Sequence, residues 1–150
     1  MPHAFTNLLT HIIFSAKDRA PLMGPEVRAR LFEYMGGIVR ELGGKALSIN
    51  GAPDHVHLLL WLPATVALSD AMRLLKTNSS RWVRESGLSR RPFAWQNGYA
   101  AFSVSQSAAS EVQRYIANQE EHHRKVSFKE ELLAYLKKHG IEYDERYLWD

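Results

Sequence analysis

The chain has no cysteine among its 150 residues. Disulfide bonds and zinc–thiolate sites are therefore excluded, and any bound metal must use nitrogen and oxygen donors. The sequence also lacks an apolar run near the roughly 20 residues that a membrane-spanning helix needs. Its first 20 residues have neither a basic start nor a small-residue cleavage site, so they do not resemble a signal peptide. We expect a cytoplasmic protein.

The formal net charge of the chain at pH 7 is also small, at +3. Hydrophobic residues make up 45% of the chain and charged residues 23%, as in an ordinary globular protein. This length suffices for one compact domain with a real core, so we expect residues 1–150 to form a single domain. The mildly basic charge is compatible with a nucleic-acid partner, although many proteins that bind no nucleic acid are equally basic.

Two histidines stand out inside an apolar run. His55 and His57 belong to the segment HVHLLLWLP, which is short and bounded by prolines, so it predicts a buried strand. Side chains alternate along a strand, so both imidazoles should point to one face and Val56 to the other. Two aligned imidazoles make half of a metal site. The pair alone does not decide between a metal site and ordinary core histidines.

The remaining pattern predicts alternating strands and helices. The expected strands cover residues 11–15, 45–50, 55–62 and 99–105. The expected helices cover residues 26–42, 69–85, from a cap at Ser107 or Ser110 to 123, and 128–139. A turn over residues 50–53 joins the second and third strands, and Ser69 is the expected cap of the second helix. This order predicts an α+β, ferredoxin-like split-βαβ fold with the first and third strands at the centre of an antiparallel sheet.

The third expected helix carries a tyrosine and a glutamine at helical spacing. Tyr115 and Gln119 are four residues apart, so on one helix they share a face. A phenol and a carboxamide presented together suit a nucleophile beside a metal ligand. Alone, the pair also fits a half-buried tyrosine and a surface glutamine. His122 and His123 are expected at the end of this helix, where cationic character complements the helix dipole.

Several segments match one family in order and spacing. They are His55-Val56-His57, Trp95 to Tyr99, Phe102 to Ser105, Tyr115 to Gln119, and Glu120 to His123. Because of these segments, the chain resembles the single-tyrosine HUH transposases of the IS200 type. The resemblance extends from about residue 11 to residue 150. These are small enzymes of bacterial insertion sequences that move as single-stranded DNA.

The resemblance implies a role for each matching residue. His55, His57 and Gln119 would bind Mg²⁺ or Mn²⁺, and Tyr115 would attack DNA to form a 5′-phosphotyrosine intermediate. The substrate would be single-stranded DNA with hairpin ends. The resemblance also implies a homodimer, in which the tyrosine helix of one subunit can complete the metal site of the other. A free tyrosine has a pKa near 10, and the sequence shows no clear base to assist it.

Basic residues supply candidate DNA contacts. They are Arg73, Lys76, Arg81, Arg84, Arg90 and Arg91. Two other functions remain as alternatives: a domesticated, non-catalytic hairpin-binding protein of the same fold, and a metal-dependent phosphoesterase that acts on small phosphates. The intact set of His55, His57, Tyr115 and Gln119 argues against the hairpin-binding protein. The helix that carries Tyr115 and Gln119 argues against the phosphoesterase.

Overall fold

The computed structural model describes residues 4–89 and 91–148. Its strands are β1 (Leu9–Ser15), β2 (Lys45–Ala52), β3 (His55–Trp61) and β4 (Ala100–Val104). Its α-helices are α1 (Pro25–Glu41), α2 (Leu68–Ser86), α3 (Ala109–Ala117), α4 (Gln119–His122) and α5 (Phe128–Lys138). The mixed α and β fold predicted from the sequence is confirmed. No described helix is long and apolar enough to cross a membrane.

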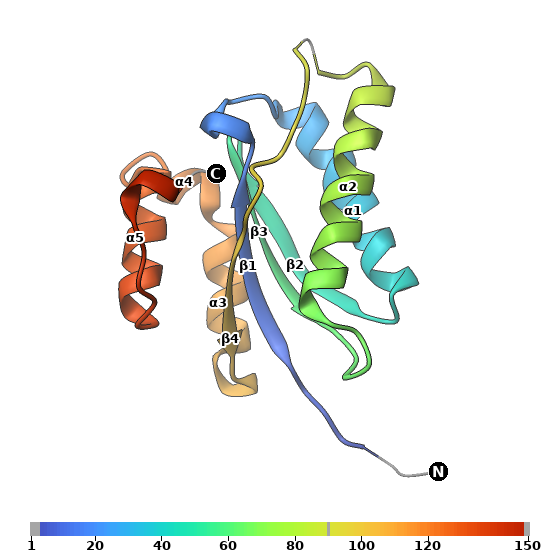
Figure 1. Ribbon diagram of the computed structural model, residues 1–150, viewed down its shortest axis with the longest axis vertical. Helices are drawn as coiled ribbons and strands as arrows, with labels where there is room; N and C mark the ends of the chain where they lie inside the picture. The colour runs from blue at the N-terminus through green and yellow to red at the C-terminus, as the bar shows by residue number, and fades with distance from the viewer. Residues whose placement is uncertain (1–3, 90, 149–150) are drawn as a thin grey trace.

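The strands form one antiparallel sheet in the order β2-β3-β1-β4. The central positions of β1 and β3 are as predicted. Helices α1 and α2 cover one face, and α3, α4 and α5 lie on the other (Figure 1). The histidine strand β3 is therefore hydrogen-bonded on both sides and covered on both faces.

Alternation along β3 divides its side chains between two layers. Val56, Leu58 and Leu60 are buried in the large apolar cluster under α1 and α2. Leu59 packs on the opposite face in a smaller cluster with Ile116 of α3. His55 and His57 point to this second face, and both are fully buried. A buried polar side chain needs a partner, so both imidazoles must be satisfied by the helices above them.

The turn between β2 and β3 lies further along the chain than predicted. Strand β2 continues to Ala52, which pairs with His55, and only Pro53 and Asp54 form the turn. The predicted turn at residues 50–53 is therefore wrong at its start. Gly51 lies within the strand and is needed there: a Cβ on it would lie 2.2 Å from the backbone oxygen of His55. The close approach of two backbones explains a glycine that otherwise suggests a turn.

We expect Gly51→Ala to destabilise the protein by at least about 2 kcal/mol, because backbone must shift to admit the methyl group. Gly37→Ala is the matched control. In α1 the new Cβ would lie 3.6 Å from Arg40 Nη2, an ordinary contact with the end of a flexible side chain. Because alanine favours a helix over glycine, this variant should gain about 0.5–1 kcal/mol. Urea unfolding of both variants checks the prediction; equal stabilities would contradict it.

The single helix predicted to end at residue 123 is broken. Helix α3 ends at Ala117, Asn118 leaves helical geometry (φ −100°, ψ 21°), and α4 starts anew at Gln119. The side-chain amide of Asn50 explains the break, since it donates to the carbonyls of Ile116 and Ala117 at 2.9 and 3.2 Å. Those carbonyls would otherwise accept from the next helical turn. Tyr115 and Gln119 therefore do not share one helix face, as the sequence had suggested.

The predicted serine caps are also wrong. Ala108 precedes α3 and Ala67 precedes α2, and neither helix has a side-chain cap. By contrast, α5 begins with a capping box, in which Ser127 Oγ accepts from the Glu130 amide at 3.2 Å.

Candidate functional site

The four predicted site residues meet where β3 faces the C-terminal helices. His55 and His57 rise from β3, Tyr115 comes from the end of α3, and Gln119 opens α4. His55 Nε2 lies 3.1 Å from Gln119 Oε1. The rings of His57 and Tyr115 are 5.9 Å apart. Despite the broken helix, the structure brings all four together, and Tyr115 meets the histidine pair of its own chain.

Each imidazole of the pair is held at Nδ1. His55 Nδ1 donates to Asp54 Oδ1 at 2.7 Å, and His57 Nδ1 lies 2.8 Å from His11 Nε2. Both Nε2 atoms consequently face the interior of the cluster. A partner at the far nitrogen fixes the ring and its tautomer, as is usual for metal-binding histidines. Asp54 and His11 are thus positioning residues. Asp54 directly precedes the pair in the sequence, whereas His11 comes from β1, which pairs with β3.

The imidazoles of His57 and His11 are predominantly neutral at neutral pH. Burial lowers the pKa of His57 to about 4 and that of His11 to about 3. For His55, burial lowers the pKa, but contacts with Asp54 and Glu131 outweigh this and leave the pKa raised. The neutral ring of His57 is the form that binds a metal ion, which would take His57 Nε2 in place of its hydrogen bond to Glu131 Oε1.

Two residues in the cluster were missed by the sequence analysis. His123 Nε2 lies 2.9 Å from Gln119 Oε1, and Glu131 Oε1 lies 2.8 Å from His57 Nε2. One potential ligand atom from each of His55, His57, His123 and Glu131 lies within 4.8 Å of the others. His123 was expected only as the end of a helix, and no pattern in the sequence singled out Glu131.

The Glu131 carboxylate is buried, with 3% of the residue exposed, and controls the ionisation of Tyr115. Burial raises the pKa of Glu131, but contacts with His123, His55 and His57 outweigh it and hold the pKa far below its usual value. Burial and the neighbouring Glu131 together raise the pKa of Tyr115 well above its usual value. The phenol is therefore protonated and donates to Glu131 Oε2. His122 Nε2 also lies 3.1 Å from this hydroxyl.

The donor set fits a divalent cation. Asp54 accepts the hydrogen of His55 Nδ1, so Nε2, which lies 3.1 Å from Gln119 Oε1, is the nitrogen that a metal ion would take. The orientation of this amide is set by its nitrogen, which donates to Glu131 Oε2 at 3.2 Å. A divalent ion between His55 Nε2 and the amide oxygen would replace the proton that a protonated ring donates to Gln119 Oε1. Imidazole nitrogen and amide oxygen are suitable donors for Mn²⁺, and the oxygen for Mg²⁺.

The predicted DNA contacts lie elsewhere. Helix α2 covers the sheet face opposite the histidine cluster (Figure 1), and Arg73, Lys76, Arg81 and Arg84 belong to it. Arg91 is exposed in the loop that follows, and Arg90 lies outside the described residues. The structure therefore does not bring the described members of this basic group to Tyr115.

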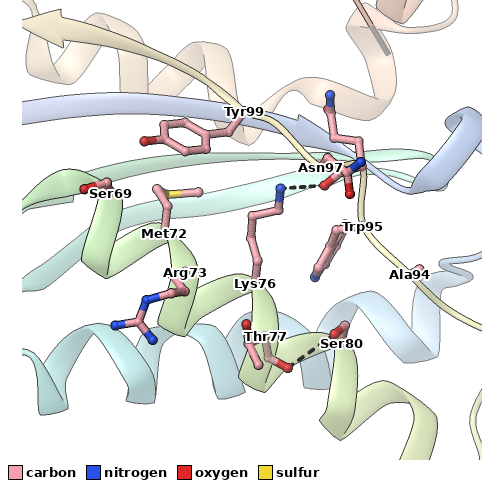
Figure 2. Close-up of a pocket in the computed structure, with 11 residues that line it drawn as sticks. Ser69, Met72, Arg73, Lys76, Thr77, Ser80, Ala94, Trp95, Asn97 and Tyr99 are labelled. Atoms are coloured by element: carbon pink, nitrogen blue, oxygen red, sulfur yellow. Dashed lines mark hydrogen bonds between the residues drawn. The ribbon is translucent and has the colours of Figure 1, made fainter. Parts of the chain in front are cut away.

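A cavity of about 420 Å³ lies between α2 and the segment that leads into β4. Arg73 and Tyr99 line it (Figure 2). Lys76 points across it and donates to the backbone oxygens of Gln96 and Gly98 at 2.5 and 2.7 Å. Burial lowers the pKa of Lys76 to about 8. Its ammonium group thus already holds the two elements together.

A ferredoxin-like sheet that carries paired histidines, with a tyrosine beside them, is the arrangement that the resemblance to DNA transposases implies. The family model "Transposase IS200 like" matches residues 4–119, and the chain belongs to this family. It is therefore a transposase of the IS200 type. His123 and Glu131 lie beyond the matched residues.

Individual relatives agree with this assignment. The chain is 29% identical over 114 residues to the ISDra2 transposase TnpA of Deinococcus radiodurans, a match that covers 73% of this chain and 81% of the relative. It is 30% identical over 129 residues to the transposase for insertion sequence element IS200 of Salmonella typhimurium, covering 79% and 81%.

Two solved structures share the fold. A crystal structure described as a transposase from Deinococcus radiodurans has a TM-score of 0.63 at 25% identity, covering 79% of this chain and 95% of that one. A REP-associated tyrosine transposase bound to a REP hairpin has a TM-score of 0.62 at 13% identity, covering 84% and 74%. At the lower identity the likeness concerns the fold alone.

Proposed function

We propose that this transposase cuts and rejoins single-stranded DNA at insertion-sequence ends through a covalent bond between DNA and Tyr115. The observation that carries the proposal is the convergence of the Tyr115 hydroxyl with buried donors of His55, His57 and Gln119. The family membership supplies DNA as the substrate class.

In the proposed cleavage step the phenol oxygen of Tyr115 attacks phosphorus. An oxygen–phosphorus bond forms to the tyrosine, and the bond from phosphorus to the 3′ oxygen breaks. The leaving oxygen gains the proton that the phenol loses, so the products are a 5′-phosphotyrosine and a free 3′-OH. Because the phosphodiester energy is kept in the adduct, a different 3′-OH can reverse the step and complete strand transfer.

His55, His57 and Gln119 are the proposed ligands of Mg²⁺ or Mn²⁺. Their donors are uncharged, which leaves the ion its full attraction for a phosphate oxygen. A bound ion of this kind polarises the phosphate and offsets the charge that develops on the departing oxygen. Asp54 and His11 hold the two rings in place. The same positive charge opposes the effect of Glu131, which otherwise keeps the Tyr115 phenol protonated.

The proposed substrate is a single strand with hairpin ends, bound by a homodimer. The basic residues of α2 and the following loop would contact the backbone of the DNA away from the cleavage site. The solved structure of the same fold that is described as bound to a REP hairpin supports this choice of substrate.

The test is a covalent-adduct assay. The full chain is mixed with labelled single-stranded oligonucleotides from the flanks of its own gene, with Mn²⁺ or Mg²⁺, and run on a denaturing gel. We expect a shifted band that requires the metal and does not form with the matching duplex. A hairpin-binding protein without catalysis would instead give a native-gel shift and no denaturation-resistant band, which would overturn the proposal.

A further inference from the structure

A buried carboxylate stands between the candidate metal donors and the candidate nucleophile. Glu131 Oε1 lies 2.8 Å from His57 Nε2, 3.2 Å from His123 Nε2 and 3.5 Å from His55 Nε2. Its other oxygen, Oε2, accepts from the Tyr115 hydroxyl. Glu131 thus connects the two halves of the site through its own carboxyl group.

His123 also directs a nitrogen that could bind a metal ion, Nε2, toward Glu131 Oε1. Its Nδ1 lies 2.8 Å from the backbone oxygen of Val126, and a carbonyl can only accept, so Nδ1 carries the hydrogen. In the neutral ring Nε2 is then bare and faces Gln119 Oε1 and Glu131 Oε1. His55 is held in the same way by Asp54. With both rings neutral, the two Nε2 atoms and the oxygens of Gln119 and Glu131 would present four donors to one cation.

The scissile phosphate needs the place that this carboxylate fills. In-line attack requires phosphorus within about 3–3.5 Å of the Tyr115 oxygen, while a phosphate oxygen reaches the metal. Glu131 already makes this bridge, with one oxygen at the imidazoles and the other at the phenol. Two negative groups cannot share the position, because burial strengthens their repulsion.

We propose that Glu131, together with His123, binds the divalent ion in the DNA-free protein and that the Glu131 carboxylate is exchanged for the scissile phosphate when DNA binds. The inference rests on the metal site of the proposed function. It adds two donors from beyond the segment matched by the family model. In the DNA-free protein the carboxylate then offsets part of the charge of the ion and accepts the hydrogen bond of the Tyr115 hydroxyl until DNA binds.

The first measurement is calorimetric titration of Mn²⁺ into the full chain without DNA. We expect Glu131→Gln to weaken Mn²⁺ binding at least about tenfold, because it keeps the shape and removes the charge. Glu130→Gln is the matched control: this neighbour is exposed, and glutamine also serves in a capping box, so Mn²⁺ affinity should not change. Unchanged affinity in Glu131→Gln would overturn the ligand role.

His123→Asn provides a second route to the same answer should the Glu131 variant fold poorly. It removes the proposed donor from a partly exposed residue, and we expect Mn²⁺ affinity to fall about tenfold. Wild-type affinity in a folded His123→Asn protein would overturn the extended ligand set.

The exchange is tested by DNA binding in saturating Mn²⁺, measured by fluorescence anisotropy of a labelled single strand. Tyr115→Phe serves as the background, so no covalent bond forms. Adding Glu131→Gln should leave DNA affinity unchanged or raise it, since a repelling charge is gone. A tenfold loss would mean that Glu131 stays on the ion beside the phosphate, against the exchange. Neither binding readout depends on catalysis, so a negative adduct assay would overturn the proposed function separately.

Discussion

Tyr115→Phe is expected to abolish the covalent DNA adduct while metal and DNA binding persist. The change removes one oxygen atom, and that atom is the proposed nucleophile. Loss of a nucleophile lowers a rate by roughly 10⁴-fold or more, so no band should survive denaturation. The fold should tolerate the change, because Glu131 Oε2 retains Gln119 Nε2 as a hydrogen-bond donor. The measurement is the denaturing-gel assay, with Mn²⁺ titration as the check on the site.

Tyr135→Phe is the matched control for this variant. Tyr135 lies on α5 with its ring 5.8 Å from that of Tyr115, and burial raises its pKa to about 12. Tyr135 is a partly buried phenol beside Tyr115, but it is Tyr115 whose ring contacts that of His57. We expect the adduct to form at a near wild-type rate. Adduct formation by Tyr115→Phe, together with its loss in Tyr135→Phe, would reassign the nucleophile.

His57→Ala is expected to lower metal-dependent adduct formation by at least about 10³-fold. The variant removes a proposed ligand from the centre of the donor set. It also deprives two buried groups, Glu131 and His11, of a partner at 2.8 Å. Glu131 keeps Tyr115 and Gln119 as donors, but His11 Nε2 loses its partner. An unsatisfied buried group costs about 1–3 kcal/mol, so the free energy of unfolding should fall as well. Adduct gels and Mn²⁺ calorimetry measure the first effect, and urea unfolding measures the second.

His139→Ala is the comparison that separates these effects. His139 caps the end of α5 and stacks on Phe102 with a ring separation of 4.5 Å, away from the donor cluster. Its loss should cost some stability but leave Mn²⁺ affinity and adduct formation near wild type. Full activity of folded His57→Ala in the presence of metal would contradict the proposed ligand set.

Local patterns in the sequence were sufficient to predict the sheet and the half of the site that β3 provides. The apolar run around His55 and His57 predicted a central strand, and strict alternation predicted that both rings share a face. Both predictions are confirmed, because period-two alternation depends only on backbone geometry. The positions of the two rings in the sheet follow from the order of strands and helices.

The half of the site that the C-terminal helices provide depends on contacts between segments that are distant in the sequence. Asn50 ends α3 by binding the carbonyls of Ile116 and Ala117, and nothing near Asn118 in the sequence indicates this. Glu131 reaches His57 only because α5 folds back over the sheet after the turn at residues 124–127. Such long-range packing has no periodic signal, so the break in the helix and the buried carboxylate were missed.

The two halves of the site differ in how firmly they are attached. The histidines belong to β3, whose amides are hydrogen-bonded between two neighbours, over the main core. Tyr115, Gln119 and Glu131 come from three short helices that pack through two smaller apolar clusters. Segments with fewer buried contacts open at a lower free energy than the core. Amide hydrogens of α4 and α5 should therefore exchange with solvent while those of β3 remain protected. Local opening of these helices would thus separate Tyr115, Gln119 and Glu131 from the site while His55 and His57 stay in place on β3.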